Sequence, residues 1–145
     1  MTIRIIYHSV DFDGIGSAAL IYHHLKNQNT DIILYPFNYY NPESLDVDSW
    51  YSNDTVYVLD VSFRPFDYML KLYNKHQNNL IYCDHHTSSL EEVQDNDLSL
   101  SGVQDKNLAT IQCVFKYIYP DKIFPKAIAL KFFNLEWKTL TNTLL

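Results

Sequence analysis

Short apolar runs alternate along the chain with longer stretches whose apolar residues recur at helical spacing. The apolar runs predict strands at residues 3–7, 32–37, 55–59 and 80–83. Helical spacing predicts helices at residues 14–27, 66–76 and 107–119. The segment 38–53, rich in Asn, Asp, Ser and Pro, is expected to be a loop, and the polar stretch after residue 86 predicts no element.

This alternation of strands and helices predicts an α/β fold. We expect a mainly parallel sheet with helices on both faces, a Rossmann-like three-layer arrangement. The length of 145 residues suits a single domain over residues 1–145. Apolar residues make up 47% of the chain, which is enough for a packed core and too many for a disordered protein.

Composition and charge exclude several classes of protein. No stretch approaches the roughly 20 apolar residues that cross a bilayer, and the run at residues 3–7 is too short for a signal peptide. We therefore expect a cytoplasmic protein without a membrane span. The two cysteines, Cys83 and Cys113, fall in apolar positions and are predicted to be buried free thiols. A net charge of −6 argues against a basic surface that holds long nucleic acid.

Three of the four predicted strands run directly into acidic residues and histidines. These residues are His8, Asp11, Asp13, Asp60, Asp84, His85 and His86. Because ligands bind at the carboxyl ends of the strands in open parallel sheets, the side chains are expected to share one rim. Gly14, which directly follows Asp13, permits a tight turn and a close approach of the backbone to phosphate.

The residue types on this rim predict a site for divalent cations. Carboxylates and imidazoles without thiolates favour Mn²⁺ or Mg²⁺ over structural zinc, while Zn²⁺ and Fe²⁺ stay open as alternatives. Four aspartates brought together repel one another unless cations neutralise them. Two divalent ions, roughly 3.5–4 Å apart, meet that requirement and are suited to phosphate-ester hydrolysis.

Three motifs in this order resemble those of the DHH phosphoesterase superfamily. They are His8-x-x-Asp11-x-Asp13-Gly14, then Asp60 after a strand, then Asp84-His85-His86. The resemblance spans residues 3–88 and favours the RecJ-like branch that includes short-oligonucleotide phosphodiesterases. Residues 102–125 resemble the less specific continuation found in that branch. The resemblance implies the DHH-domain fold and a phosphohydrolase activity.

The resemblance also implies five metal ligands. A first ion would be bound by His8 and Asp11, and a second by Asp13 and His85. Asp60 would bridge both ions. Mn²⁺ is the expected metal, with Mg²⁺ or another divalent ion as the alternative. Taken alone, Asp60 could equally cap the turn that follows it, which is a common role for aspartate.

The expected catalytic residues are Asp60, Asp84 and His86. By resemblance, His86 would face the substrate phosphate and Asp84 would orient a histidine. Arg64, four residues after Asp60, is a further candidate for holding phosphate, with an ordinary surface arginine as the alternative.

The sequence departs from the family pattern after residue 125. The family supplies a further aspartate there, in a stretch that also contains a tryptophan. Trp137 is present here, but the expected aspartates are not. Glu136 could substitute as a ligand, against which stand its longer side chain and shifted position. The usual second, substrate-binding domain is not expected within residues 1–145. The apolar residues Leu140, Leu144 and Leu145 are expected to continue into more structure or to cover a partner, with a homodimer as one form of it.

These observations leave two main hypotheses. The first is a Mn²⁺-dependent hydrolase that cleaves phosphodiester bonds in short oligonucleotides or nucleotides through a water activated by two metal ions. The second is a catalytically incomplete DHH domain that acts as a metal- or nucleotide-binding or interaction module. A pyrophosphatase-like enzyme would share the metal site, but that group relies on a cationic second domain. Turnover separates the first hypothesis from the second, and the substrate separates the first from the third.

Overall fold

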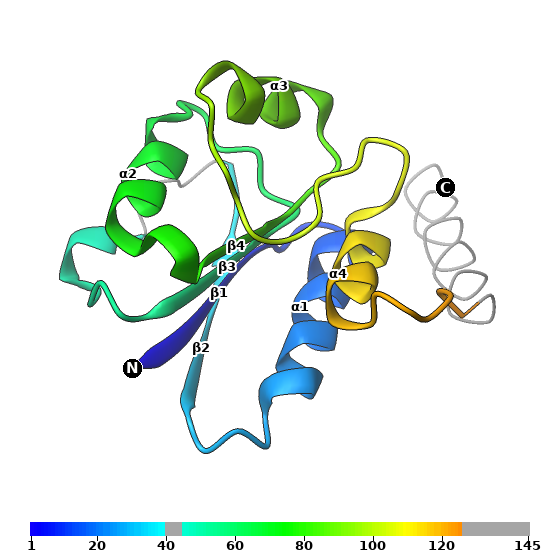
Figure 1. Ribbon diagram of the computed structural model, residues 1–145. Helices are drawn as coiled ribbons and strands as arrows, with labels where there is room; N and C mark the ends of the chain where they lie inside the picture. Colours follow the sequence, from blue (N-terminus) through cyan, green and yellow to red (C-terminus); the bar gives the residue numbers. More distant parts are fainter. Residues whose placement is uncertain (40–44, 126–145) are drawn as a thin grey trace, which may run out of the picture.

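The computed structural model describes residues 1–39 and 45–125 (Figure 1). Within these ranges, four strands form one parallel sheet in the order β2-β1-β3-β4. The strands are β1 (Thr2–His8), β2 (Asp31–Phe37), β3 (Thr55–Leu59) and β4 (Leu80–Cys83). The predicted strands are confirmed, and β3 and β4 have the predicted ends.

Helices cover both faces of the sheet, as expected for the predicted α/β fold (Figure 1). One face is covered by α1 (Phe12–Leu25) and α4 (Thr110–Ile118), and the other by α2 (Asp67–His76) and α3 (Thr87–Asp95). Two short 3₁₀ helices, η2 (Val47–Ser49) and η3 (Gln77–Asn79), flank β3 and α2. No helix in the described part of the chain is long and apolar enough to cross a membrane.

Alternating residues of the central strands supply two separate cores. In β3, Val56 and Val58 belong to the core on the α2 side, whereas Tyr57 and Leu59 belong to the core on the α1 side. Because both faces are covered, the strand is a continuous apolar run rather than an alternating one. Cys83 lies in the core on the α1 side, and both cysteines are buried free thiols, as predicted.

Several helices begin at other residues than predicted. Helix α1 begins at Phe12 rather than Gly14, since the Asp11 carboxylate accepts a hydrogen bond from the Gly14 N–H (2.9 Å). Helix α4 begins at Thr110 rather than residue 107, and α2 begins one residue later than predicted. Residues 38–53 include the helix η2 in addition to loop.

The sequence predicted no helix or strand directly after residue 86. That prediction was wrong, because α3 occupies Thr87–Asp95. The chain then runs beside β4, where isolated parallel bridges join Ile81 to Ser101 and Asp84 to Gln104. Gly102 has φ +106°, and a Cβ there would lie 2.1 Å from the Tyr82 carbonyl oxygen. This passage leads the chain back across the carboxyl end of β4 to the start of α4.

Some predictions fall on residues 126–145, which lie outside the described part of the chain. These predictions concern Glu136 as a substitute ligand and the apolar residues Leu140, Leu144 and Leu145.

Candidate metal centre

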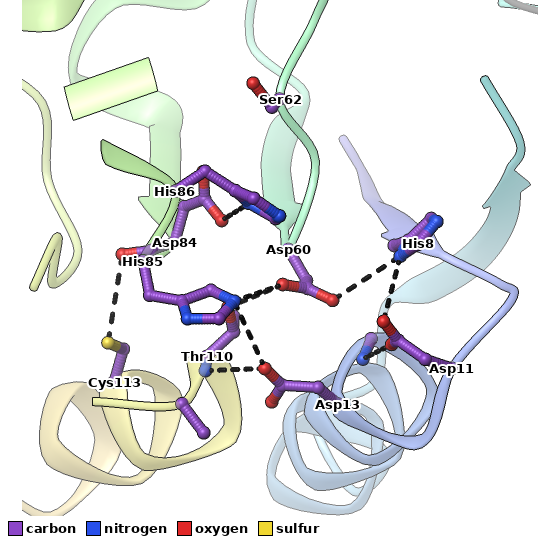
Figure 2. A network of polar contacts seen from close by, with 12 residues as sticks. His8, Asp11, Asp13, Asp60, Ser62, Asp84, His85, His86, Thr110 and Cys113 are labelled. Atoms are coloured by element: carbon purple, nitrogen blue, oxygen red, sulfur yellow. Dashed lines mark hydrogen bonds and ion pairs between the residues drawn. The ribbon is translucent and has the colours of Figure 1, made fainter. Parts of the chain in front are cut away.

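The motif residues meet at the carboxyl edge of the sheet, as the sequence predicts (Figure 2). His8 is the last residue of β1, Asp60 directly follows β3, and Asp84 directly follows β4. Asp11 and Asp13 come from the start of α1, whose first turn points at the same edge. The convergence follows from the parallel order of the strands, which places three strand ends side by side.

Asp60 lies at the middle of this group and is only 1% exposed. Its Oδ2 atom is 3.6 Å from His8 Nδ1, and its Oδ1 atom is 3.3 Å from His85 Nε2. The backbone of Asp60 has φ +59°, in the left-handed region that aspartate tolerates better than most residues. A strained residue held in place by its surroundings is typical of functional sites.

The charge of Asp60 is favoured by its neighbours. Burial alone would raise the pKa of Asp60, but His85, the Thr110 hydroxyl and the charge of His86 outweigh burial and hold the pKa below its ordinary value. Asp60 is therefore an anion in a buried position, which requires compensating positive charge.

His8 faces the carboxylates of Asp11 and Asp60 through its Nδ1 atom. Its Nδ1 atom is 3.3 Å from Asp11 Oδ2, and it is buried with no hydrogen-bond partner among the described residues. Gly14, in the first turn of α1, lets this helix pack closely against the backbone of His8. A Cβ on Gly14 would lie 1.9 Å from the His8 carbonyl oxygen, so no larger residue fits there.

Asp13 is held by the first turn of α4. Its two carboxylate oxygens accept hydrogen bonds from the N–H groups of Thr110 (3.0 Å) and Ile111 (2.8 Å). Burial, together with the charge of Asp60, raises the pKa of Asp13 to about 6 despite these hydrogen bonds. Asp13 thus caps a helix in addition to facing the site, a contact between residues 97 positions apart that the sequence could not reveal.

His85 lies between the Asp60 and Asp13 carboxylates, and its Nε2 atom is 3.6 Å from Asp13 Oδ2 (Figure 2). The contact with Asp60, with added attraction from the charge of Asp13, raises the pKa of His85 to about 8. The position of its Nε2 atom therefore favours positive charge near neutral pH.

Asp84 contacts His86, the histidine that follows it by two residues, through a side-chain hydrogen bond. Asp84 is fully buried; its Oδ1 atom is 2.7 Å from His86 Nδ1, and its Oδ2 atom accepts a hydrogen bond from the Tyr82 hydroxyl at 2.5 Å. The hydrogen bond to Asp84 raises the pKa of His86. Both oxygens of Asp84 are therefore engaged within the protein, as are both oxygens of Asp13.

Arg64 is not drawn into this group. It is exposed, its guanidinium donates to the Phe63 carbonyl oxygen (3.0 Å), and it forms no ion pair with the described carboxylates.

Sequence reasoning gave no role to Thr110 or Tyr82. Tyr82 is two residues before Asp84 in a buried strand, and a tyrosine in an otherwise apolar run indicates a hydroxyl that needs a buried partner.

The donor set fits divalent cations. Among the residues that the structure describes, two groups offer ligand atoms that lie within 4.8 Å of one another; they are His8, Asp11 and Asp60, and Asp60, Asp84, His85 and His86. Asp60 belongs to both groups. Oxygen and imidazole donors, a buried anion, and an unpartnered buried nitrogen on His8 are the features that an ion between them would satisfy.

Comparisons with known proteins agree with these motifs. The family model for the N-terminal domain of the DHH family matches residues 2–138. A relative, the uncharacterized protein R106 of Acanthamoeba polyphaga mimivirus, is 27% identical over an alignment that covers 86% of this chain. The alignment covers 31% of that relative, so the chain spans about a third of its length. No solved structure matches. The match over nearly the whole chain shows that this protein belongs to the DHH family and has the phosphoesterase-superfamily fold.

Proposed function

We propose that this domain is a divalent-metal-dependent phosphohydrolase that cleaves phosphodiester bonds in short oligonucleotides or nucleotides. Membership of the DHH family supports a hydrolase of phosphate esters. Mn²⁺ is the proposed ion, because carboxylates and imidazoles without thiolates suit it.

One observation carries the proposal: Asp60 is shared by two adjacent groups of metal-ligand atoms. A buried carboxylate with one oxygen toward His8 and the other toward His85 has the arrangement that a bridging ligand requires. His8, Asp11 and Asp60 would hold one ion, and Asp60, His85 and Asp13 a second. Ions held there would polarise the phosphoryl oxygens and make water a stronger nucleophile at neutral pH.

His86 is the residue of this chain best suited to handle the substrate. Asp84 engages Nδ1 and stabilises the protonated ring, so Nε2 is the nitrogen left to meet a phosphate oxygen. The side chain is 38% exposed, whereas its partner Asp84 is fully buried. A protonated His86 can bind the phosphate and donate a proton to the departing oxygen.

Two features favour a short substrate that carries a base. The chain has a net charge of −6, so a long polyanion would gain little from its surface. Tyr39 is 40% exposed, its ring centroid lies 5.1 Å from that of His8, and its hydroxyl accepts a hydrogen bond from the Ser62 N–H. A ring fixed beside the metal centre offers a surface on which a base can stack. The exposed Arg64 is the proposed contact for a second phosphate.

The test is hydrolysis of bis-p-nitrophenyl phosphate and of a short oligonucleotide, with and without Mn²⁺. Asp60→Asn is the test variant, because asparagine keeps the size of the side chain and tolerates the positive φ. The proposal expects Mn²⁺-dependent turnover in the wild type and its loss in the variant. Equal turnover in the two proteins would overturn it.

A second candidate function, a metal- or nucleotide-binding module without catalysis, is favoured by one sequence observation. Glu136 stands near Trp137 where the family supplies aspartate, so the ligand set departs from the family pattern. Binding of Mn²⁺ by the wild type without hydrolysis of either substrate would establish this function in place of the first.

A further inference from the structure

Thr110, the first residue of α4, contacts two of the clustered carboxylates at once. Its hydroxyl donates a hydrogen bond to Asp60 Oδ1 (2.9 Å), and its backbone N–H donates to Asp13 Oδ2 (3.0 Å). The residue is 0% exposed, so water does not compete for either contact. Figure 2 shows Thr110 on the α4 side of the cluster, next to the His85 ring.

We propose that Thr110 is a positioning residue of the metal centre, and that the first turn of α4 sets the spacing and orientation of Asp60 and Asp13. This inference rests on the proposed function, since it concerns the same ions. Neither the motifs nor the family resemblance assigns Thr110 a role.

The hydroxyl of Thr110 does not cap its own helix. The N-cap residue of α4 is Ala109, whose methyl side chain offers no acceptor to the N–H groups of the first turn. Here the Asp13 carboxylate performs that capping, and the Thr110 hydroxyl is directed at Asp60 instead. The contact therefore serves the carboxylate more than it serves the helix.

Asp60 needs such a contact because the terminal torsion of an aspartate side chain is broad. A donor on Oδ1 fixes the plane of the carboxylate. It leaves Oδ2 directed at His8, 3.6 Å from Nδ1. Without the hydroxyl, the two oxygens would no longer be held toward the two groups of ligands at the same time.

Thr110 is held in place by the packing of α4 against α1 and the sheet. Cys113 and Val114 of α4 pack in one core with Ala18 and Ile21 of α1, the helix whose first turn contains Asp13. Both helices pack against the sheet, and Asp60 directly follows strand β3 of this sheet. The position of the Thr110 hydroxyl relative to the two carboxylates is thus fixed by core packing rather than by a loop.

The chain allows a closely matched pair of variants. Thr110→Val keeps the branched shape and the N–H to Asp13 but removes the hydroxyl, whereas Thr110→Ser keeps the hydroxyl and removes a methyl group. We expect Mn²⁺ affinity, measured by isothermal titration calorimetry on the full chain, to fall by about 10- to 100-fold in Thr110→Val, as for other residues that orient metal ligands. Affinity in Thr110→Ser should stay close to that of the wild type.

The controls separate the possible failures. Melting temperatures without metal show whether each variant folds, and Thr110→Ala replaces Thr110→Val if the latter does not. Equal Mn²⁺ affinity in the wild type and in the variant without hydroxyl would overturn the role of Thr110 while leaving the proposed function intact. Equal loss of affinity in Thr110→Ser would overturn it too, because a methyl group would then be responsible. A wild type that binds no Mn²⁺ would overturn both proposals.

Discussion

The two ends of strand β3 carry aspartates that are equally buried and differently surrounded. Asp54 directly precedes the strand and is 0% exposed, and Asp60 directly follows it and is 1% exposed. Asp54 accepts hydrogen bonds from Arg4 Nε (2.8 Å), the Thr2 N–H (2.9 Å) and the Tyr51 N–H (3.2 Å). Arg4 in turn donates to the Tyr35 hydroxyl and lies over a tryptophan ring.

Among the described residues, Asp60 forms no ion pair with an arginine or lysine. It lies among further carboxylates and histidines, one of which, His8, leaves a buried nitrogen without a partner among the described residues. Both aspartates have a pKa below the ordinary value, Asp54 chiefly through Arg4 and Asp60 through histidines and Thr110, in each case against the effect of burial. The comparison teaches that Asp54 is paired with an arginine, whereas in the described part of the chain Asp60 faces histidines, whose charge depends on pH.

The largest expected effect is on activity. Asp60→Asn should lower Mn²⁺-dependent hydrolysis on the order of 1,000-fold, as expected when a central group of an active site is removed. Asp54→Asn should leave the turnover number of the folded fraction unchanged. Initial rates on bis-p-nitrophenyl phosphate, normalised to the folded fraction from circular dichroism, test this. A similar loss of turnover in both variants would mean that the two ends are not functionally distinct.

The second effect is on stability without metal. Asp54→Asn removes one partner of a nearly buried ion pair, leaves Arg4 uncompensated, and should cost about 3 kcal/mol of unfolding free energy. Asp60→Asn should cost less, because the loss of its contacts with His85 and Thr110 is partly offset by relief of the repulsion with Asp13. Urea unfolding in the presence of a chelator measures both. A larger loss for Asp60→Asn than for Asp54→Asn would contradict the comparison.

The third effect is the pH dependence of stability from Asp54. Its folded-state pKa is lowered, so its contribution is fully present above the unfolded-chain pKa of about 3.9 and is lost as the pH falls through the folded-state value. Asp54→Asn should flatten this part of the profile, which urea unfolding between about pH 2 and pH 5 measures. An unchanged slope would show that Arg4 does not favour the charge of Asp54.

The smallest effect is a slope of opposite sign from Asp13. Burial and the charge of Asp60 raise its folded-state pKa to about 6, so the folded protein keeps a proton that the unfolded chain has lost. Without metal, stability should therefore fall as the pH rises from the unfolded-chain value of about 3.9 toward the folded-state value. Asp13→Asn should remove that fall. A wild-type profile with no fall in this interval would contradict it.

The sequence predicted the sheet because the strands are continuous apolar runs ended by polar residues. Residues 55–59 and 80–83 were found with their observed ends, and the parallel order then placed the motif residues at one edge. Helix α3 was missed because its nine residues include few apolar ones; Leu90 and Val93 are too few for a clear helical spacing.

What the sequence could not show are the contacts made across the fold. Thr110 and Asp13 are far apart in the chain and meet only because α4 packs beside α1. The pair of Arg4 and Asp54 likewise depends on the pairing of β1 with β3. The motifs single out Asp60, but only the structure shows that Asp54, before the same strand, is paired with Arg4.

The central claim is that Asp60, unlike Asp54, belongs to a site for divalent cations. The most direct measurement is the change in melting temperature on adding Mn²⁺ to the wild type, Asp60→Asn and Asp54→Asn. The account predicts that Mn²⁺ raises the melting temperature of the wild type and of Asp54→Asn, because an ion that binds only the folded state stabilises it, and that it leaves Asp60→Asn unchanged. An equal rise in all three proteins would contradict it.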